Sequence, residues 1–356
     1  MLVLINNLSK TKMVSTRSMT KSRLVATEVI TAISSDTNKI IRKRTIKKVA
    51  ESSTKKRKVI SEKIVQINVV PTSSGPSETT IKRLQDKYIS DFVTAAKHVL
   101  TVDPTLEPYI LNANLPSFSK SEAEPFQAAV SEYKKDKIDG RKELLQYFFS
   151  ALCRGLIGQQ VSGAAARSIK IKIQKLYKGE GTEFPPPKFF VEAAPEDLRG
   201  AGLSLRKVEY MKGTAEAFIK NDTEEFVDFM LNGDNQAIID RLVELKGIGE
   251  WSAQMFLIFG MKKLDIFAPG DLGIAKGASL YLKDREDLFA KLKSTVEIDP
   301  KYPCKWTKTK SKPKRTWIPI HEQYMIAAAG QFEPYRSVFS LLMWQVASTN
   351  LDVLKE

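Results

Sequence analysis

The chain has 356 residues, enough to bury a core in one large or two modest domains and still leave a tail. It contains only two cysteines and two histidines, which fits a reducing compartment and excludes a four-cysteine iron–sulfur or zinc site and histidine-rich metal chemistry. The net charge is +15, no apolar run reaches membrane-spanning length and no secretory leader is recognisable, so we expect a soluble intracellular protein.

Residues 1–85 hold most of the positive charge. This segment contains 18 Lys and Arg against five Asp and Glu, which gives +13 of the total +15. It is rich in Ser and Thr and has no sustained amphipathic period. The composition predicts a disordered basic tail.

Two clusters within this tail resemble the signals that nuclear import receptors bind. They are IRKRTIKK at 41–48 and KKRKV at 55–59. A generic polycation that raises non-specific DNA affinity is a compatible alternative. We expect a nuclear protein; a mitochondrial transit peptide is less favoured, although the first 27 residues contain no acid.

Residues 86–350 predict an all-helical domain, because strand-like alternation is almost absent. The first helix carries an apolar stripe and ends before Asp103-Pro104. The polar, lysine-rich segment 119–140 predicts a loop or an exposed insertion, and residues 142–177 return to helix. The stripe consists of Tyr88, Phe92, Ala95, Ala96, Val99 and Leu100.

The segment 157–166, IGQQVSGAAA, combines small residues that permit tight helix packing with two adjacent amides. Gln159 and Gln160 can contact a DNA backbone or base edge, or can serve as buried caps. Helix resumes over 193–220. The basic segment 301–315 carries seven Lys or Arg and two prolines, which predicts a loop that lies along a phosphate backbone or is simply solvated.

The most informative pattern is LKGIGEWSA at 245–253, a very short turn between two segments of helical periodicity. Glycines allow positive φ and leave no Cβ to obstruct another backbone. The amides that begin the second helix favour a phosphate, so such a hairpin binds one DNA strand without recognising sequence. An ordinary helix–helix turn with a glycine cap is the alternative from these residues alone.

Four motifs in order then carry a family resemblance: IGQQVS, GLSLRKVEY, LKGIGEWSA with the following FAPGDLGIAKG, and PYRSVFSLLMW. Together they span 156–344. The chain resembles the 3-methyladenine DNA glycosylases of the AlkA type, in their compact fungal form, within the helix-hairpin-helix base-excision superfamily. The resemblance implies the all-α helix-hairpin-helix DNA glycosylase fold.

The resemblance also implies roles for individual residues. Asp271 falls on the catalytic carboxylate, although the preceding Pro-Gly alone predicts a helix N-cap. Leu205 falls on the residue that wedges into the duplex where the target nucleotide has left the stack. Trp251 and Trp344 fall on aromatic positions of the base pocket. Met255 replaces a tyrosine of the bacterial relatives, so we expect a changed base preference rather than lost activity.

The hairpin residues that the resemblance assigns to DNA binding are Gly247, Ile248, Gly249 and Ser252, and Gln159 and Gln160 join them. Relatives often bind an alkali cation through hairpin carbonyl oxygens, so this ion is the one cofactor that the resemblance implies. No metal is expected on side chains.

Bifunctional members of the superfamily place a lysine where this chain has Trp251, so no lyase activity is expected. The implied function is hydrolysis of the N-glycosidic bond of alkylated purines, of the 3-methyladenine and 7-methylguanine type, in duplex DNA by a monomer. Three alternatives stay open: a glycosylase for an oxidised or deaminated purine, a non-catalytic module for damaged or branched DNA, and a structural nucleic-acid protein driven by the tail.

Overall fold

The computed structural model of the chain describes residues 75–177, 183–300, 304, 306 and 317–348. Among these residues the regular structure is helical, apart from one isolated β-bridge between Tyr88 and Ser119. The predicted all-α class is confirmed for this part of the chain. Residues 1–74, with both basic clusters, and most of the predicted loop 301–315 lie outside the described residues.

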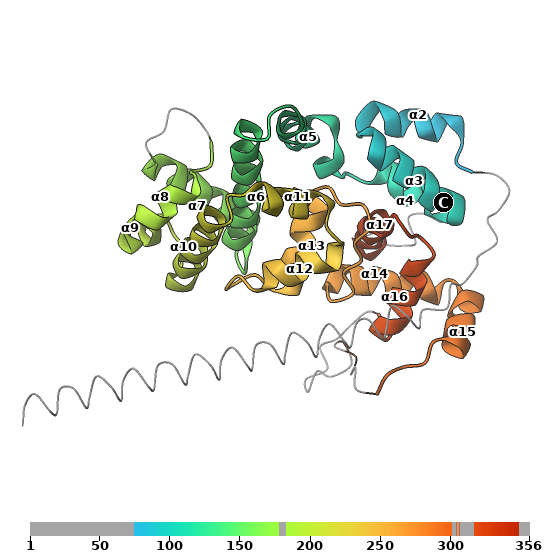
Figure 1. Cartoon of the computed structure of the whole chain (residues 1–356). Coiled ribbons are helices and arrows are strands. Elements are labelled where there is room, and N and C mark those ends of the chain that lie inside the picture. Colours follow the sequence, from blue (N-terminus) through green and yellow to red (C-terminus); the bar gives the residue numbers. More distant parts are fainter. Residues whose placement is uncertain (1–74, 178–182, 301–303, 305, 307–316, 349–356) are drawn as a thin grey trace, which may run out of the picture. The chain divides into compact units, whose positions relative to one another are not determined.

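The helices of the first half run from the start of the described chain past the IGQQVS motif (Figure 1). They are α2 (Glu78–Lys87), α3 (Ser90–Val102), η1 (Pro104–Leu106), α4 (Glu107–Asn112), η2 (Pro116–Phe118), α5 (Lys120–Lys135), α6 (Asp139–Gly158) and α7 (Gly163–Leu176).

The helices of the second half carry the hairpin and the predicted carboxylate. They are α8 (Pro187–Glu192), α9 (Pro195–Gly200), α10 (Leu205–Lys220), α11 (Glu224–Asn232), α12 (Asn235–Val243), α13 (Glu250–Met255), the π-helical turn η3 (Phe256–Gly260), α14 (Leu272–Lys283), α15 (Glu286–Thr295), α16 (Glu322–Gly330) and α17 (Arg336–Ser348).

Helix α2 corrects the predicted boundary of the tail at residue 85. The helix begins at Glu78, where the Ser77 hydroxyl accepts a hydrogen bond from the Thr80 amide at 3.1 Å. Thr80 and Leu84 are buried. Because only a narrow face of this charged helix contacts the core, its apolar signal was too weak to separate it from the basic tail.

Helix α5 corrects the predicted loop at 119–140. Ser119 caps the helix, which packs against α6, and the Tyr133 hydroxyl donates a hydrogen bond to Asp228 of α11 at 2.9 Å. The buried residues are Ala123, Ala129 and Tyr133. Two of these three are alanines, so the buried stripe has low hydropathy among many charges and gave no strong period.

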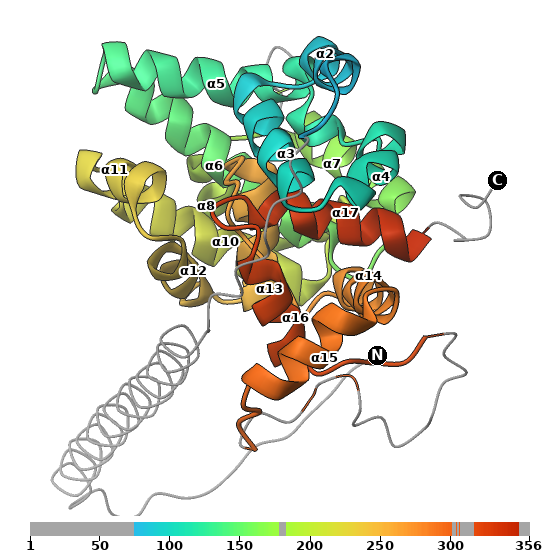
Figure 2. The same cartoon turned by 90° about the vertical axis from the view of Figure 1, so that its right-hand side faces the viewer.

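Helix α17, the last helix in the described chain, packs against helices from the beginning of that chain. It packs against α14 and also against α3 and α4, which come from the N-terminal side (Figures 1 and 2). Gly277 of α14 lies against the Met343 backbone, where a Cβ would come within 1.9 Å of the carbonyl oxygen. Asp103 at the end of α3 accepts hydrogen bonds from the Tyr281 hydroxyl and the Arg285 Nε. The N-terminal helices therefore support α14, which begins directly after Asp271.

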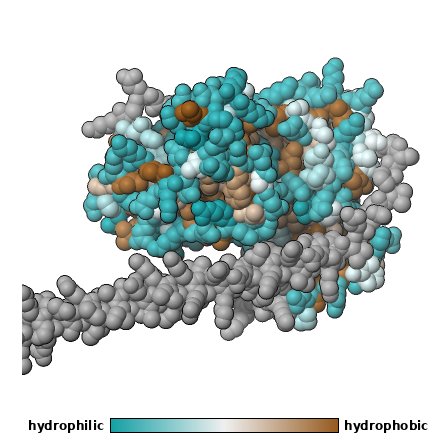
Figure 3. Space-filling view, viewed as in Figure 1, coloured by the Kyte–Doolittle hydropathy of each residue, from teal (hydrophilic) through white to brown (hydrophobic). Residues whose placement is uncertain are grey.

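The surface seen in Figure 3 is mainly hydrophilic, with small and separated apolar patches. Among the helices that the structure describes, none is long and apolar enough to cross a membrane.

Candidate active site

The hairpin between α12 and α13 needs glycine at one of its two glycine positions. Gly247 has φ +92°, and a Cβ on it would come within 2.2 Å of the Tyr210 ring of α10. Gly249 has φ −92°, with open space where a Cβ would stand. Gly247 therefore allows the turn to pack on α10, while Gly249 leaves an unobstructed approach from solvent.

The outer side of the hairpin can accept a phosphate. Gly249 is the N-cap of α13, and no side chain caps the amides of its first turn. Ile248 is buried, with 4% of its surface exposed, and anchors the turn to the core. Ile248 therefore contributes its backbone, and not its side chain, to any DNA contact.

The end of α6 supports the hairpin from inside. The Gln159 side-chain amide donates to the Gly247 carbonyl at 3.0 Å and to the Ser252 hydroxyl at 3.3 Å. Lys207 of α10 donates to the carbonyls of Ile157 and Gln159, both at 2.7 Å. Partial burial lowers the pKa of Lys207. These bonds join α6, α10 and the hairpin, so Gln159 serves an internal contact in the free protein.

Two predicted DNA-binding side chains near this junction face solvent. Leu205 is the first residue of α10, directly after the N-cap Ser204, and 55% of its surface is exposed. Gln160 is also exposed, and its backbone adopts a left-handed conformation with φ +56°. An exposed leucine at a helix start is available to enter a duplex.

Asp271 caps a helix and also binds two tryptophan side chains. Its Oδ1 accepts a hydrogen bond from the Ile274 amide at 2.9 Å, which makes it the N-cap of α14. Oδ1 also accepts from the Trp344 indole at 2.7 Å, and Oδ2 accepts from the Trp251 indole at 2.8 Å. The sequence had suggested an N-cap and a catalytic carboxylate as two roles of one residue, and the cap is confirmed. The carboxylate is held by donors from α13, α14 and α17.

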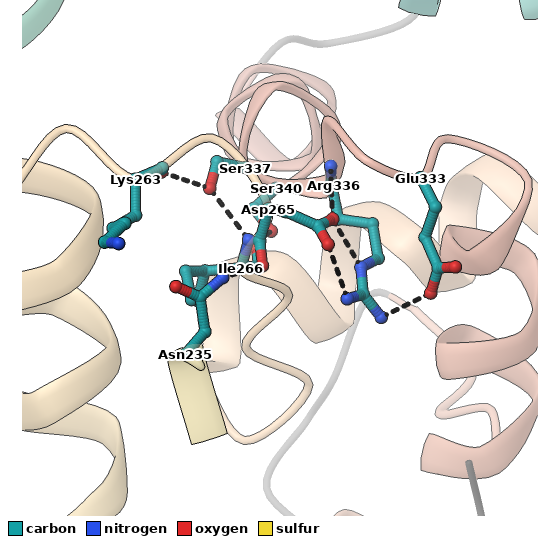
Figure 4. A network of polar contacts seen from close by, with 8 residues as sticks. All are labelled: Asn235, Lys263, Asp265, Ile266, Glu333, Arg336, Ser337 and Ser340. Carbon is teal, nitrogen blue, oxygen red and sulfur yellow. Dashed lines mark hydrogen bonds and ion pairs between the residues drawn. The ribbon is translucent and has the colours of Figure 1, made fainter. Parts of the chain in front are cut away.

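A polar network fixes the loop that precedes Asp271 onto the start of α17 (Figure 4). The Arg336 guanidinium forms two hydrogen bonds with the Asp265 carboxylate, at 2.7 and 2.8 Å. The Ser337 hydroxyl donates to the Lys263 carbonyl and accepts from the Ile266 amide. This network sets the position of α17, and therefore of Trp344, relative to Asp271. The PYRSVFSLLMW motif contains Arg336, but its sequence did not reveal this role.

A cavity of about 280 Å³ lies between α6 and the second hairpin helix. Trp251, Met255 and Phe259 line one side of it. Trp344 is not among its lining residues; its ring stacks on Phe259 with centroids 5.7 Å apart and an interplanar angle of 13°. Trp251 and Phe259 make this side of the cavity aromatic, as a pocket for a flat base requires, and Trp251 also donates to Asp271, which is not itself a lining residue.

The same cavity contains a cation that the sequence did not single out. Arg154 of α6 lines it. Lys262, just beyond the π-helical turn, donates to the carbonyl of the cavity residue Phe259 at 2.6 Å. Burial, and to a smaller extent Arg154, lower the pKa of Lys262 to about 8. Arginine occurs so often on solvated helix faces that its position in the sequence carried no signal.

Of the predicted site residues, Trp251, Met255, Gln159 and Ser252 line the cavity. Asp271 and Trp344 do not line it; Asp271 is joined to it through the Trp251 indole, and Trp344 through Asp271 and Phe259. Among the residues that the structure describes, no group of three or more His, Cys, Asp or Glu could hold a metal ion. Fold and site together define a helix-hairpin-helix protein with a carboxylate beside an aromatic cavity.

Comparison with known proteins agrees with this class. Residues 153–297 match the family model described as HhH-GPD superfamily base excision DNA repair protein. The DNA-3-methyladenine glycosylase of Saccharomyces cerevisiae (strain ATCC 204508 / S288c) is 35% identical over 285 residues, which cover 76% of this chain and 86% of that protein. DNA-3-methyladenine glycosylase 1 of Schizosaccharomyces pombe is 30% identical over 42% of this chain and 62% of its own. DNA-3-methyladenine glycosylase 2 of Escherichia coli K12 is 30% identical over 33% and 43%.

The chain belongs to the DNA-3-methyladenine glycosylase family of the HhH-GPD superfamily of base excision DNA repair proteins. DNA is therefore its macromolecular partner.

Proposed function

We propose that this protein hydrolyses the N-glycosidic bond of alkylated purines, of the 3-methyladenine and 7-methylguanine type, in duplex DNA. This is the first step of base excision repair. The observation that carries the proposal is the Asp271 carboxylate, held by Trp251 and Trp344 beside the aromatic cavity. Family membership supports the reaction class.

The target base must leave the duplex before the carboxylate can act on its sugar. The open face of Gly249 and the uncapped start of α13 hold a backbone phosphate of one strand. The exposed Leu205 occupies the space that the flipped nucleotide leaves. The base then stacks against Trp251 and Met255 in the cavity.

Alkylation at N3 or N7 gives the purine a positive charge, which weakens its bond to the sugar. A cationic base also gains roughly 0.5–2 kcal/mol from an aromatic face. As the bond breaks, the sugar acquires oxocarbenium character. The negative Asp271 stabilises this charge and accepts the proton of the attacking water.

We also propose that the enzyme is monofunctional. Trp251 stands two residues after the second hairpin glycine, where bifunctional relatives have a lysine. Lys207, the lysine closest to the wedge in sequence, is bonded to the carbonyls of Ile157 and Gln159. The product would be an abasic site in an intact strand.

An alkali cation at the hairpin belongs to the same proposal. The carbonyl oxygens of Leu245, Gly247 and Gly249 each accept a hydrogen bond, from the Ile248 amide, the Gln159 side chain and the Ala253 amide. A carbonyl has two lone pairs, so each of these oxygens keeps one that is available to a cation ligated by the hairpin.

Nuclear localisation through an import receptor, and action as a monomer, remain proposals from the sequence. The basic clusters at 41–48 and 55–59 that support import lie outside the described residues.

The test is release of free methylated purines from alkylated duplex DNA by wild type and by Asp271→Asn. Asparagine keeps the size of the side chain but removes its charge, so we expect the single-turnover rate to fall roughly 100-fold or more. Affinity for abasic-site DNA should stay within a few-fold. The wild-type product strand should remain intact until alkali is added.

Asp284→Asn, at the other end of α14, is the matched control and should leave the rate unchanged. Near-normal turnover by Asp271→Asn would remove the catalytic assignment. Strand cleavage by wild type without alkali would contradict the monofunctional mechanism.

A further inference from the structure

Two hydrogen bonds of equal length tie residues between α15 and α16 to α14 and the turn before it. The Ile320 amide donates to the Ser279 hydroxyl, in the second half of α14, at 3.3 Å. The Trp306 indole donates to the Pro269 carbonyl, also at 3.3 Å, and the Trp306 ring packs against the hydrophobic core. Pro269 stands two residues before Asp271. One of the two bonds therefore reaches the chain that leads into the proposed catalytic carboxylate.

The Pro269 carbonyl belongs to the central peptide of a tight turn. The Asp271 amide donates to the Ala268 carbonyl at 3.0 Å, so Pro269 and Gly270 are the two corner residues. Ala268 is fully buried, which fixes the start of the turn. The Asp271 carbonyl then accepts from the Ala275 amide in the first turn of α14. The turn therefore sets the direction in which the chain enters α14 and the angle at which the Asp271 side chain leaves it.

A proline followed by a glycine permits two forms of such a turn. The two forms differ by a rotation of the central peptide by about 180°, and the type II form needs positive φ at the glycine. Gly202 and Gly247 are the glycines with positive φ in the described part of the chain, so the turn at Gly270 is not of type II. Because glycine has no Cβ, Gly270 itself does not exclude type II. The hydrogen bond from the Trp306 indole holds the Pro269 carbonyl in the observed orientation.

We propose that Trp306 is a positioning residue for Asp271. Its indole keeps the central peptide of the turn in one orientation, and this orientation places the carboxylate where the indoles of Trp251 and Trp344 donate to it. The inference rests on the proposed glycosylase function and adds to it a residue outside the four sequence motifs. A side chain between α15 and α16 thus contributes to the chemical step, although Trp306 does not line the cavity.

Two substitutions at Trp306 separate the hydrogen-bond donor from the packing of the ring. Trp306→Phe keeps an apolar ring and removes the N–H. Trp306→His loses apolar surface but keeps an N–H at the equivalent position of a five-membered ring, two bonds beyond Cγ. Because the two new side chains rank in opposite order as donors and as apolar groups, catalytic rate and stability should rank the two variants in opposite order.

The measurement is the single-turnover release of 7-methylguanine from a duplex by saturating full-length protein at about pH 8, where an ordinary histidine is neutral. We expect Trp306→Phe to lower this rate about three- to ten-fold, as the loss of one hydrogen bond between uncharged groups implies. Trp306→His should retain about half of the wild-type rate or more. Its free energy of unfolding should nevertheless fall below that of the Phe variant, because it buries less apolar surface. Affinity for abasic-site DNA should stay within a few-fold for both.

Ser279→Ala is the matched control. It removes the other of the two bonds, eight residues or roughly 12 Å along the helix from Asp271. The buried Ile320 amide then lacks its acceptor, so the free energy of unfolding should fall while the single-turnover rate stays unchanged.

A Phe variant as fast as wild type would overturn the inference. A rate that follows stability, with the His variant slower than the Phe variant, would overturn it as well, because Trp306 would then act only through packing. The same holds if Ser279→Ala is slowed as much as Trp306→Phe, since any loosening of this part of the fold would then suffice. In each of these outcomes the wild type still releases the base, so the proposed function stands. Failure of the wild type to release it would contradict the proposed function and the inference with it.

Discussion

The carboxylate of Asp271 accepts three hydrogen bonds, from the Ile274 amide and from two indoles. A flexible carboxylate would have to be ordered during the reaction, which slows catalysis. Here the cap fixes the position of the side chain, and the indoles of Trp251 and Trp344 fix the direction of both oxygens. In the proposed mechanism, this fixed geometry at Asp271 removes a reorganisation cost from the chemical step.

Trp344 can be tested apart from the pocket, since it does not line the cavity. Trp344→Phe keeps an aromatic ring on Phe259 and removes the donor to Asp271 Oδ1. A hydrogen bond to a charged group contributes about 1.5–3 kcal/mol, so we expect the single-turnover rate to fall about ten-fold or more. Abasic-site affinity should change little.

Trp344→Leu is the comparison variant, because it removes both the donor and the ring. If the Phe variant works as fast as wild type while the Leu variant fails, the stack on Phe259, and not the hydrogen bond, is the contribution of Trp344 to catalysis.

At the scale of elements, close packing between helices decides where the site forms. Gly277 allows α14 to lie directly on the α17 backbone, and this contact brings Trp344 of α17 to Asp271 at the start of α14. The Arg336–Asp265 pair holds the other end of α17. The spacing of these two helices is therefore part of the geometry on which the proposed mechanism depends.

Two glycine-to-alanine substitutions test this spacing. Gly213 lies inside α10 with nothing within 4 Å of an added Cβ, so Gly213→Ala should stabilise the protein by about 0.5–1 kcal/mol through helix propensity. A Cβ on Gly277 would clash with the Met343 carbonyl, so Gly277→Ala should destabilise by about 1–3 kcal/mol.

The free energy of unfolding, from denaturant titration at fixed salt, measures both changes. Gly213→Ala serves as the control for helix propensity. An equal gain in stability from Gly277→Ala would show that α14 and α17 are not in close contact, and would remove the argument for how Trp344 reaches Asp271.

At the scale of the whole molecule, most of the net positive charge is concentrated in one part of the chain. Residues 1–74 hold 16 Lys and Arg against four Asp and Glu, so +12 of the +15 lies before the described helices and only +3 belongs to residues 75–356. We therefore expect long-range attraction to DNA to depend mainly on the tail, and base removal to depend on the proposed site around Asp271.

Deletion of residues 1–74 separates these contributions. The cut ends before α2, whose Leu84 is buried, so the helical unit keeps its packing. Each lost phosphate contact should reduce the slope of log affinity against log salt by about 0.9, and we expect a loss of several units for non-specific duplex DNA. The single-turnover rate at saturating protein should not change.

Salt titrations of full-length and truncated protein provide the measurement. An unchanged slope would mean that the tail does not contact DNA. A truncated protein with a slower chemical step would place part of the active site in the tail, against the geometry of Asp271.

The sequence by itself determined the all-α class, the hairpin at 245–252 and the N-cap role of Asp271. These features are local: periodicity, glycine at a turn and an aspartate before a helix all act through neighbours within a few residues. Local signals failed at α2 and α5, because helices with short or alanine-rich buried faces resemble solvated segments in composition.

Only the tertiary structure decided which side chains meet. It showed that Gln159 is bonded to the hairpin, that Trp344 donates to Asp271 and stacks on Phe259, and that Arg154 lines the cavity. The hydrogen bonds among these contacts join residues up to 93 positions apart, and the same residue types occur elsewhere on solvated faces. The packing of the helices decides which of these side chains meet. Sequence periodicity shows which face of a helix is buried but not which helix packs against that face.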